Sequence, residues 1–365
     1  MSDAPSFVLS GPGGTLVAHG LRAAYPGIDA ARAALASGEE PIILGALPFD
    51  VSSPSALMTP QAYGFSDALP HLPRQALPSA RIAATVPTPD EHGERIARAL
   101  AALRDPGGGL RKVVLARALD VAFDGPLDAT TVLGRLAAAD PAAYSYLADL
   151  TAAGGGYAGR ALVGATPELL VSRTGDKVTC QPFAGSAPRS ADPATDQANG
   201  AALLESTKNR LEHALVVDEM SAVLDGFCAD LHVASVPQLD STAALWHLST
   251  PIVGSLRDTS TTALDLALAL HPTPAVGGVP GDAAAAMIAA LEGDRGFYAG
   301  ATGWCDRNGD GRWVVSIRCA ELSADRLRAR VYSGGGIVAD SDVSDEIAET
   351  TTKFKTILHA LGVPI

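Results

Sequence analysis

The sequence predicts an α+β fold, with helices and mixed or antiparallel strands that follow one another without regular βαβ alternation. Two observations carry this expectation. Apolar, β-branched runs typical of strands recur along the chain, and two long segments near its middle and end have the apolar spacing of amphipathic helices. Hydrophobic residues make up 47% of the 365 residues and charged residues 18%, which is the composition of a core-forming globular protein.

The first third of the chain is rich in Pro, Ala and Ser and alternates short apolar runs with turn-like pieces. Pro41–Leu47 is apolar and predicts a strand. Glu91–Leu103 has helical spacing of its apolar residues, and the Pro- and Gly-rich segment 104–109 ends that helix. No repeat and no long linker indicates a domain boundary, so we expect a single domain over 1–365.

The pattern becomes sharper after residue 110. Lys112–Phe123 is apolar and β-branched and predicts a strand, and Glu168–Ser172 predicts another after a turn at 165–167. Leu203–Leu224 keeps one face apolar and predicts a single helix.

The C-terminal part predicts a strand pair followed by a helix. Trp313–Leu322 alternates as a half-buried strand, and Arg326–Tyr332 is its expected partner. Three consecutive glycines, 334–336, then predict a sharp backbone feature, and a closing helix is expected over about 344–361.

Charge and cysteine content exclude several classes of protein. The 27 basic and 40 acidic residues give a net charge of −13, which argues against nucleic acid or an anionic membrane as a partner. A small anionic substrate would need local basic groups and a metal ion. Four cysteines without a CxxC pair or zinc spacing are typical of buried free thiols in the cytoplasm. We expect no transmembrane helix and no signal peptide.

Acidic residues on the two long helices are candidate metal ligands. Glu346, Glu349 and Lys353 are spaced i, i+3 and i+7, so they share one helix face, and Glu212 lies on the 203–224 helix. Carboxylates of this kind suit a hard divalent cation, with the lysine near an anion. A solvated charged face and an ordinary amphipathic helix explain the same two patterns.

Glycine-rich and acidic loops offer weaker signals. The glycine triplets at 107–109 and 154–156 lack a following Lys-Ser/Thr helix, so they predict loops rather than phosphate-binding loops. Residues 306–311 imitate the start of a calcium loop, but Ile317 stands where a bidentate Glu is required. A hairpin turn is therefore expected there. The glycines at 334–336 follow a strand directly, so their N–H groups can approach a carboxylate.

Ordered blocks from residue 112 onward resemble a known family. They include KVVLAR at 112–117, GATPEL at 164–169, AGSAPR at 184–189, ESTKNRLEHALVV at 205–217, LHPTPAVGG at 270–278, VVSIRCA at 314–320, GGGIVADS at 334–341 and EIAETTTK at 346–353. Together they resemble the chorismate-utilising enzymes, and among these the isochorismate synthases. The resemblance is firm over 106–362 and thinner over 1–105.

The resemblance implies an ADC synthase-like fold, with a β-sandwich-like core of two mostly antiparallel sheets surrounded by helices. It also implies chorismate as substrate and Mg²⁺ as cofactor. Glu212 and Glu349 would bind the metal directly, and Glu346 through water. The substrate-binding residues that it implies are Gly185, Ser186, His247, Ala275, Tyr298, Arg318, Gly334, Gly335, Gly336 and Lys353. Arg318 and the three glycines would hold the enolpyruvyl carboxylate.

Two positions bear on which reaction of the family takes place. Lys112 matches the lysine that acts as general base towards water, whereas members that use ammonia generally carry another residue. Ala275 matches the isochorismate synthases, where salicylate synthases and ammonia users usually carry threonine. Glu168 matches the general acid. The reaction requires a base on one face of the substrate and an acid on the other, because water loses a proton as it attacks and hydroxide is a poor leaving group.

The resemblance therefore implies reversible conversion of chorismate to isochorismate, which feeds siderophore or menaquinone biosynthesis. A salicylate synthase, which also eliminates pyruvate, is the alternative, and a catalytically silent chorismate-binding relative is a second one. No glutaminase subunit is expected, and a monomer is expected from the family.

Overall fold

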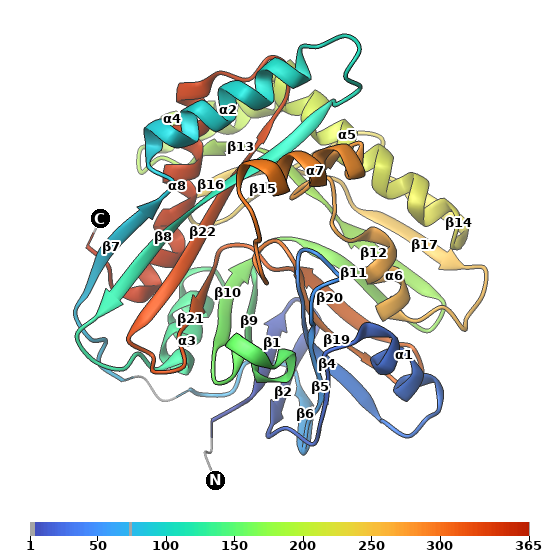
Figure 1. Ribbon diagram of the computed structural model, residues 1–365. Coiled ribbons are helices and arrows are strands. Elements are labelled where there is room, and N and C mark those ends of the chain that lie inside the picture. Colours follow the sequence, from blue (N-terminus) through green and yellow to red (C-terminus); the bar gives the residue numbers. More distant parts are fainter. Residues whose placement is uncertain (1–3, 73–74, 365) are drawn as a thin grey trace.

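Two large antiparallel sheets form the centre of the computed structural model, which describes residues 4–72 and 75–364 (Figure 1). The ten-stranded sheet contains, in order, β18 (Gly278–Val279), β8 (Lys112–Phe123), β22 (Arg328–Ile337), β21 (Cys319–Leu322), β10 (Ala161–Thr166), β9 (Tyr144–Asp149), β1 (Phe7–Gly11), β2 (Gly14–His19) and β6 (Ala62–Ser66), with β7 (Ala80–Val86) paired to β8. The nine-stranded sheet contains β14 (Cys228–Val233), β17 (Ile252–Leu256), β12 (Lys177–Gln181), β11 (Leu169–Thr174), β20 (Gly311–Val315), β19 (Ala301–Asp306), β4 (Ile42–Leu47), β5 (Ala56–Thr59) and β3 (Ala23–Tyr25).

A third, small sheet and eight helices in the described residues complete the fold. The small sheet has the order β13 (Phe183–Pro188), β16 (Leu245–Ser249) and β15 (Gln238–Ser241). The helices are α1 (Ile28–Ala36), α2 (Pro89–Leu103), α3 (Ala129–Ala139), α4 (Pro193–Glu205), α5 (Thr207–Asp225), α6 (Ala263–Leu270), α7 (Gly281–Leu291) and α8 (Val343–Leu361). Short 3₁₀ turns occupy Thr151–Ala153 and Gly155–Tyr157.

The main hydrophobic core lies between the two large sheets. Phe7 and Leu9 of β1 and Leu44 of β4 belong to the same buried cluster as Trp313 of β20. A second cluster joins the ten-stranded sheet to α3 and α8, and a third joins α2 and α7 to β8. The expected α+β fold with a sandwich-like core and surrounding helices is therefore confirmed.

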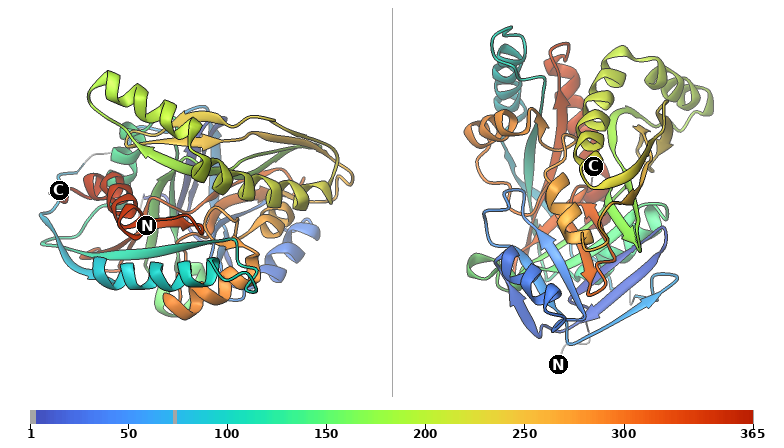
Figure 2. Two further views of the ribbon diagram at one scale, coloured as in Figure 1. Left: turned by 90° about the horizontal axis from the view of Figure 1, so that it is seen from above. Right: turned by 90° about the vertical axis from the view of Figure 1, so that its right-hand side faces the viewer.

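Helix α8 lies between α2 on one side and the α4–α5 pair on the other in both views of Figure 2. It packs on β22, where Ser333 Oγ donates to the carbonyl of Thr350. Asp342 begins the helix by accepting hydrogen bonds from the N–H groups of Ser344 and Asp345. This arrangement brings one face of α8 against the glycine-rich end of β22.

Three local expectations are wrong, each for a reason of chain geometry. The helix expected over 203–224 is two helices, because Ser206 is extended and its hydroxyl caps α5 at the N–H of Asn209. The strand expected over 313–322 is β20 and β21 in different sheets, since the chain crosses between them at Arg318, whose φ is 53°. The glycines 334–336 form no sharp feature, since they continue β22 opposite Ala116, Leu115 and Val114.

Other expectations are confirmed. Lys112–Phe123 is a strand with the predicted bounds, and residues 306–311 form the expected hairpin turn between β19 and β20. All four cysteines are buried free thiols. Among the described residues, none of the helices has the length and apolar character needed to cross a bilayer.

Candidate active site

A small cavity of about 70 Å³ opens where β22, α5, α8 and the small sheet meet. Twelve of the fifteen residues that the sequence singles out line it: Glu168, Gly185, Ser186, Glu212, His247, Ala275, Tyr298, Arg318, Gly334, Gly336, Glu349 and Lys353. The other three, Lys112, Gly335 and Glu346, lie immediately behind this lining. Residues from every part of the chain after position 110 therefore converge at one place.

Glu168 follows Pro167 in the turn between β10 and β11, and its N–H is fixed by the hydroxyl of Thr166. Its side chain is buried, and its Oε1 has no hydrogen-bond partner. Burial raises the pKa of Glu168 to about 8, although the positive charge of Lys112 acts against this rise. The carboxyl is therefore protonated and able to donate a proton at neutral pH.

Lys112 is the first residue of β8 and is fully buried. Its Nζ lies 3.1 Å from Glu212 Oε1 on α5. The Lys112 Cε also lies close to Gly336, since a Cβ on that glycine would be 3.1 Å from it. The charge of Lys112 also acts on the buried carboxyl of Glu168. A buried lysine near a buried carboxylic acid is a typical arrangement for acid–base chemistry.

The three candidate metal ligands are each paired with a lysine. Glu212 is paired with Lys112, Glu346 with Lys208 at 2.6 Å and Glu349 with Lys353 at 2.5 Å. Ser341 also donates to Glu346, and Ser186 donates to Glu349. Within the described parts of the chain, no three His, Cys, Asp or Glu side chains are close enough together to form a ready-made metal cluster.

The two carboxylates on α8 have opposite pKa shifts. Burial, followed by the negative charge of Glu349, raises the pKa of Glu346, although Lys208 acts against it. Burial also acts to raise the pKa of Glu349, but the charge and hydrogen bond of Lys353 outweigh it and leave this pKa below its ordinary value. Glu349 is thus the more readily ionised of the pair.

The glycines of β22 make room for these carboxylates on both faces of the strand. A Cβ at Gly336 would overlap Glu212 Oε1 and lie 2.9 Å from its Cδ, and a Cβ at Gly335 would lie 3.1 Å from Glu346 Oε2. That Oε2 atom is buried without a partner. Hard oxygen donors with an unpaired buried oxygen fit a divalent cation such as Mg²⁺.

The opposite side of the cavity carries a buried cation and aromatic rings. Arg318 is 7% exposed and sits at the crossing between the sheets. Tyr298 stacks on Tyr332, with ring centroids 4.7 Å apart, and a Cβ at Gly334 would lie 2.9 Å from the Tyr298 hydroxyl. Burial, with the charges of Arg318 and Lys353, holds the pKa of His247 well below its ordinary value, so this ring is neutral.

Three further residues lie around the site. His213, next to Glu212, has a pKa lowered to about 4 by burial and by the charge of Lys112, so its ring is neutral. Its Nε2 shares a hydrogen bond of 2.7 Å with Thr250, and its Nδ1 is buried without a partner. Sequence reasoning assigned no role to Lys208 or Ser341, which hold Glu346. The i, i+4 spacing of Lys208 and Glu212 was the only signal for the former.

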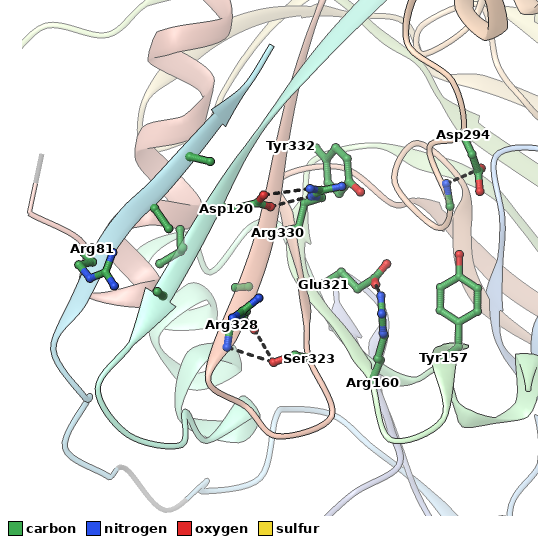
Figure 3. A pocket seen from close by; sticks show the side chains of 16 residues that line it. Arg81, Asp120, Tyr157, Arg160, Asp294, Glu321, Ser323, Arg328, Arg330 and Tyr332 are labelled. Atoms are coloured by element: carbon green, nitrogen blue, oxygen red, sulfur yellow. Dashed lines mark hydrogen bonds and ion pairs between the residues drawn. The ribbon is translucent and has the colours of Figure 1, made fainter. Parts of the chain in front are cut away.

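A larger cavity of about 660 Å³ lies farther along β22 and shares Tyr332 with the small one (Figure 3). Most of the acidic side chains that line it are paired with arginines. Asp120 binds Arg330 through two hydrogen bonds, and Glu321 binds Arg160. The small cavity is lined by buried ionisable groups with unpartnered atoms, such as Glu168 and His247, so of the two cavities we take the small one as the candidate active site.

Comparisons with known proteins identify the family of the chain. The family model described as chorismate binding enzyme matches residues 36–362. The chain is 61% identical over 359 residues to a Mycobacterium tuberculosis protein provisionally named isochorismate synthase MenF, covering 98% of this chain and 96% of that protein. It is 41% identical over 378 residues to isochorismate synthase DhbC of Bacillus subtilis, covering 98% and 94%. A crystal structure from Bacillus anthracis, provisionally named a 2,3-dihydroxybenzoate-specific isochorismate synthase, has a TM-score of 0.90 at 37% identity and covers 99% of this chain and 97% of that one. The chain therefore belongs to the chorismate-binding enzymes.

Proposed function

We propose that this protein is an isochorismate synthase, which reversibly converts chorismate to isochorismate by adding water at C2 and expelling the C4 hydroxyl. One observation carries the proposal. A buried lysine, Lys112, and a buried, protonated carboxyl, Glu168, lie in one site, close enough for the charge of the lysine to lower the pKa of the acid. Water addition with loss of hydroxide needs a base and an acid of this kind.

In this mechanism Lys112 takes the proton that water loses as it attacks C2. Lys112 must be neutral to do so, and its Nζ lies 3.1 Å from Glu212 Oε1. Glu168 donates its proton to the departing C4 oxygen. The burial that keeps Glu168 protonated supports this role, because an ionised carboxylate has no proton to give.

The substrate is a dicarboxylate, and the site offers cations for it. Arg318 and the backbone of Gly334, Gly335 and Gly336 would bind the enolpyruvyl carboxylate, with Tyr298 beside them. Lys353, which donates to the carbonyl of Gly334 at 2.9 Å, would neutralise charge between the carboxylates. Gly185, Ser186, His247 and Ala275 line the remaining wall.

Mg²⁺ fits the opposite end of the cavity. Glu212 and Glu349 would hold it directly and Glu346 through water, since Mg²⁺ takes one or two protein carboxylates and retains waters. When bound, the metal polarises the ring carboxylate of the substrate and offsets the clustered negative charge.

The product decides between this function and its alternatives. Incubation with chorismate and Mg²⁺, followed by chromatography, should give isochorismate without pyruvate. Pyruvate with salicylate would identify a salicylate synthase, and an aminated product on addition of ammonia would identify an ammonia user. Chorismate binding without any turnover would identify a silent relative.

Two variants test the roles of the acid and the base in the same assay. Lys112→Ala and Glu168→Gln should each nearly abolish turnover while chorismate still binds. Full activity of either variant would refute that assignment.

The wider setting follows from the same chemistry. We place the enzyme in the cytoplasm as a monomer that needs no glutaminase subunit, and its product would feed siderophore or menaquinone biosynthesis. Nucleic acid and membrane are not expected partners, given the net charge of −13.

A further inference from the structure

Lysine is scarce in this chain, and its placement is informative. The sequence contains five lysines, and three of them, Lys112, Lys208 and Lys353, each pair with one of the three candidate metal ligands. Each of the three candidate ligand carboxylates is thus paired with a lysine side chain. A buried site of three unpaired carboxylates would be strongly destabilised by mutual repulsion.

Lys208 differs from the other two lysines in its freedom to move. Lys112 is fully buried, and Lys353 is held by the Gly334 carbonyl as well as by Glu349. The side chain of Lys208 is 28% exposed, and among the residues that the structure describes its hydrogen-bond partner is Glu346 alone. It can therefore leave the carboxylate for solvent without breaking another contact.

The position of Lys208 in its helix is locally unfavourable. It is the second residue of α5, and the N-terminal turn of a helix disfavours cations because the helix dipole is positive there. Its ammonium reaches instead to Glu346 on α8, 138 residues away in sequence. Burial acts to lower the pKa of Lys208, but the charge of Glu346, followed by those of Glu212 and Glu349, outweighs burial and raises this pKa. Lys208 is therefore placed by the carboxylates of the site rather than by its own helix.

We propose that Lys208 is a displaceable counter-ion, which balances the carboxylates while the metal site is empty and competes with Mg²⁺ for them. This inference rests on the Mg²⁺ site of the proposed function. Glu346 has one oxygen bound by Lys208 and Ser341 and another, Oε2, that is buried without a partner. Entry of a divalent cation changes the charge of the site by two, and departure of the Lys208 ammonium to solvent removes one of these charges.

The experiment measures Mg²⁺ affinity by calorimetry in the absence of chorismate, for the wild type and for Lys208→Met. Loss of the competing charge should tighten Mg²⁺ binding on the order of tenfold. The increase in Tm caused by saturating Mg²⁺ should also be larger in Lys208→Met, because the empty variant contains an unbalanced carboxylate. Neither readout depends on turnover.

Matched variants keep the test sharp. Lys208→Arg retains the charge and should bind Mg²⁺ nearly as the wild type does. Lys177→Met removes an exposed lysine at the start of β12 and should leave the affinity unchanged. If Lys208→Met does not fold, Lys208→Gln, which retains a donor for Glu346, provides the neutral variant.

The outcomes separate the inference from the proposed function. Tighter Mg²⁺ binding by the neutral variants supports the counter-ion role. Unchanged binding overturns it, and weaker binding overturns it as well, since that result would show that Lys208 only positions Glu346. A wild type that binds no Mg²⁺ would refute the metal site of the proposed function itself.

Discussion

The Glu168 carboxyl has its properties set by burial rather than by sequence neighbours. Its pKa of about 8 means that the acid is protonated below that pH and loses its proton above it. We therefore expect kcat/KM for chorismate to fall as the pH increases through about 8. Rates measured from pH 6 to 10 check this, with chorismate binding by Glu168→Gln over the same range as the control. A rate that stays constant to pH 10 would contradict the role of Glu168 as an acid.

The same group makes stability depend on pH. Its pKa is higher in the folded chain than in the unfolded one, so its contribution is fully present below about pH 4.3 and is lost as the pH rises through about 8. Gln does not titrate. The stability of Glu168→Gln relative to the wild type should therefore increase by up to about 1.4 kcal/mol per pH unit within this window.

Urea unfolding at several pH values measures this difference. Glu94→Gln, which removes an exposed carboxyl on α2, is the matched control. A pH-independent difference for Glu168→Gln would show that the buried carboxyl does not titrate as described.

Gly336 is required because a larger residue at this position would occupy the space of the Glu212 side chain. Its backbone is an ordinary strand conformation, but a methyl group there would overlap the Glu212 carboxylate. Gly336→Ala should fold, displace Glu212 and weaken Mg²⁺ binding by on the order of tenfold or more. Calorimetry checks this against Gly64→Ala, a strand glycine with open space around it. Equal Mg²⁺ affinities in the two variants would remove Glu212 from the metal site.

Sequence patterns indicated the candidate site residues but not their pairing. The residues of the matched motifs converge on one cavity, because those motifs carry the ends of strands and the inner faces of α5 and α8. The pairing of Lys208 with Glu346 spans 138 residues, and no local pattern encodes such a contact. The burial that changes the pKa of Glu168 likewise depends on the whole tertiary structure.

One arginine of β8 adds polar contacts to the apolar packing that holds helix α8 on the sheet. Arg117 is 5% exposed and donates to the hydroxyl of Thr350, to that of Thr351 and to the carbonyl of Ile347. Its guanidinium also lies over the ring of Phe354, 5.3 Å from the centroid. The position of both α8 carboxylates therefore depends on this contact.

Arg117→Met should destabilise the protein by about 1–3 kcal/mol, because buried hydrogen-bonding groups of α8 lose their donor. It should also weaken Mg²⁺ binding through Glu346 and Glu349. Denaturant unfolding and calorimetry measure the two effects. Arg330→Met, which removes an exposed pair with Asp120, should cost at most about 1 kcal/mol. Equal effects of the two substitutions would show that Arg117 does not anchor the helix.

Elements that are continuous and apolar were predictable, and those shaped by tertiary structure were not. Lys112–Phe123 was predicted with its observed bounds because its composition is uniformly strand-like. The helical periodicity continues through Ser206, so the break between α4 and α5 has no periodic signal. The division of 313–322 occurs because Arg318 crosses between two sheets, which alternation along one strand does not reveal.

At the scale of the whole molecule, the motif-poor first 105 residues are structurally integrated. They supply β1, β2, β6 and β7 to one large sheet and β3, β4 and β5 to the other. Phe7 and Leu44 lie in the central core between the sheets. The single domain expected over 1–365 stays a prediction, which a fragment of the chain tests.

A fragment of residues 106–362 should therefore fail to fold, because it would expose the inner faces of both sheets. Circular dichroism and size-exclusion chromatography should show an aggregated or unfolded chain, whereas the full chain should unfold in a single thermal transition. A monomeric fragment with native-like spectra would show that the N-terminal part is a separate unit.

The small volume of the active-site cavity has a kinetic consequence. Ligand pockets usually measure about 300 Å³ or more, and this one measures about 70 Å³, so the empty site must widen before it can accept a dicarboxylate ring. The wall formed by Gly185, Ser186 and His247 belongs to a three-stranded sheet separate from the two large ones, so we expect the widening to take place there. Substrate capture would then have two steps. At high chorismate concentration, we expect the rate of capture to be limited by the opening of that wall and not by diffusion.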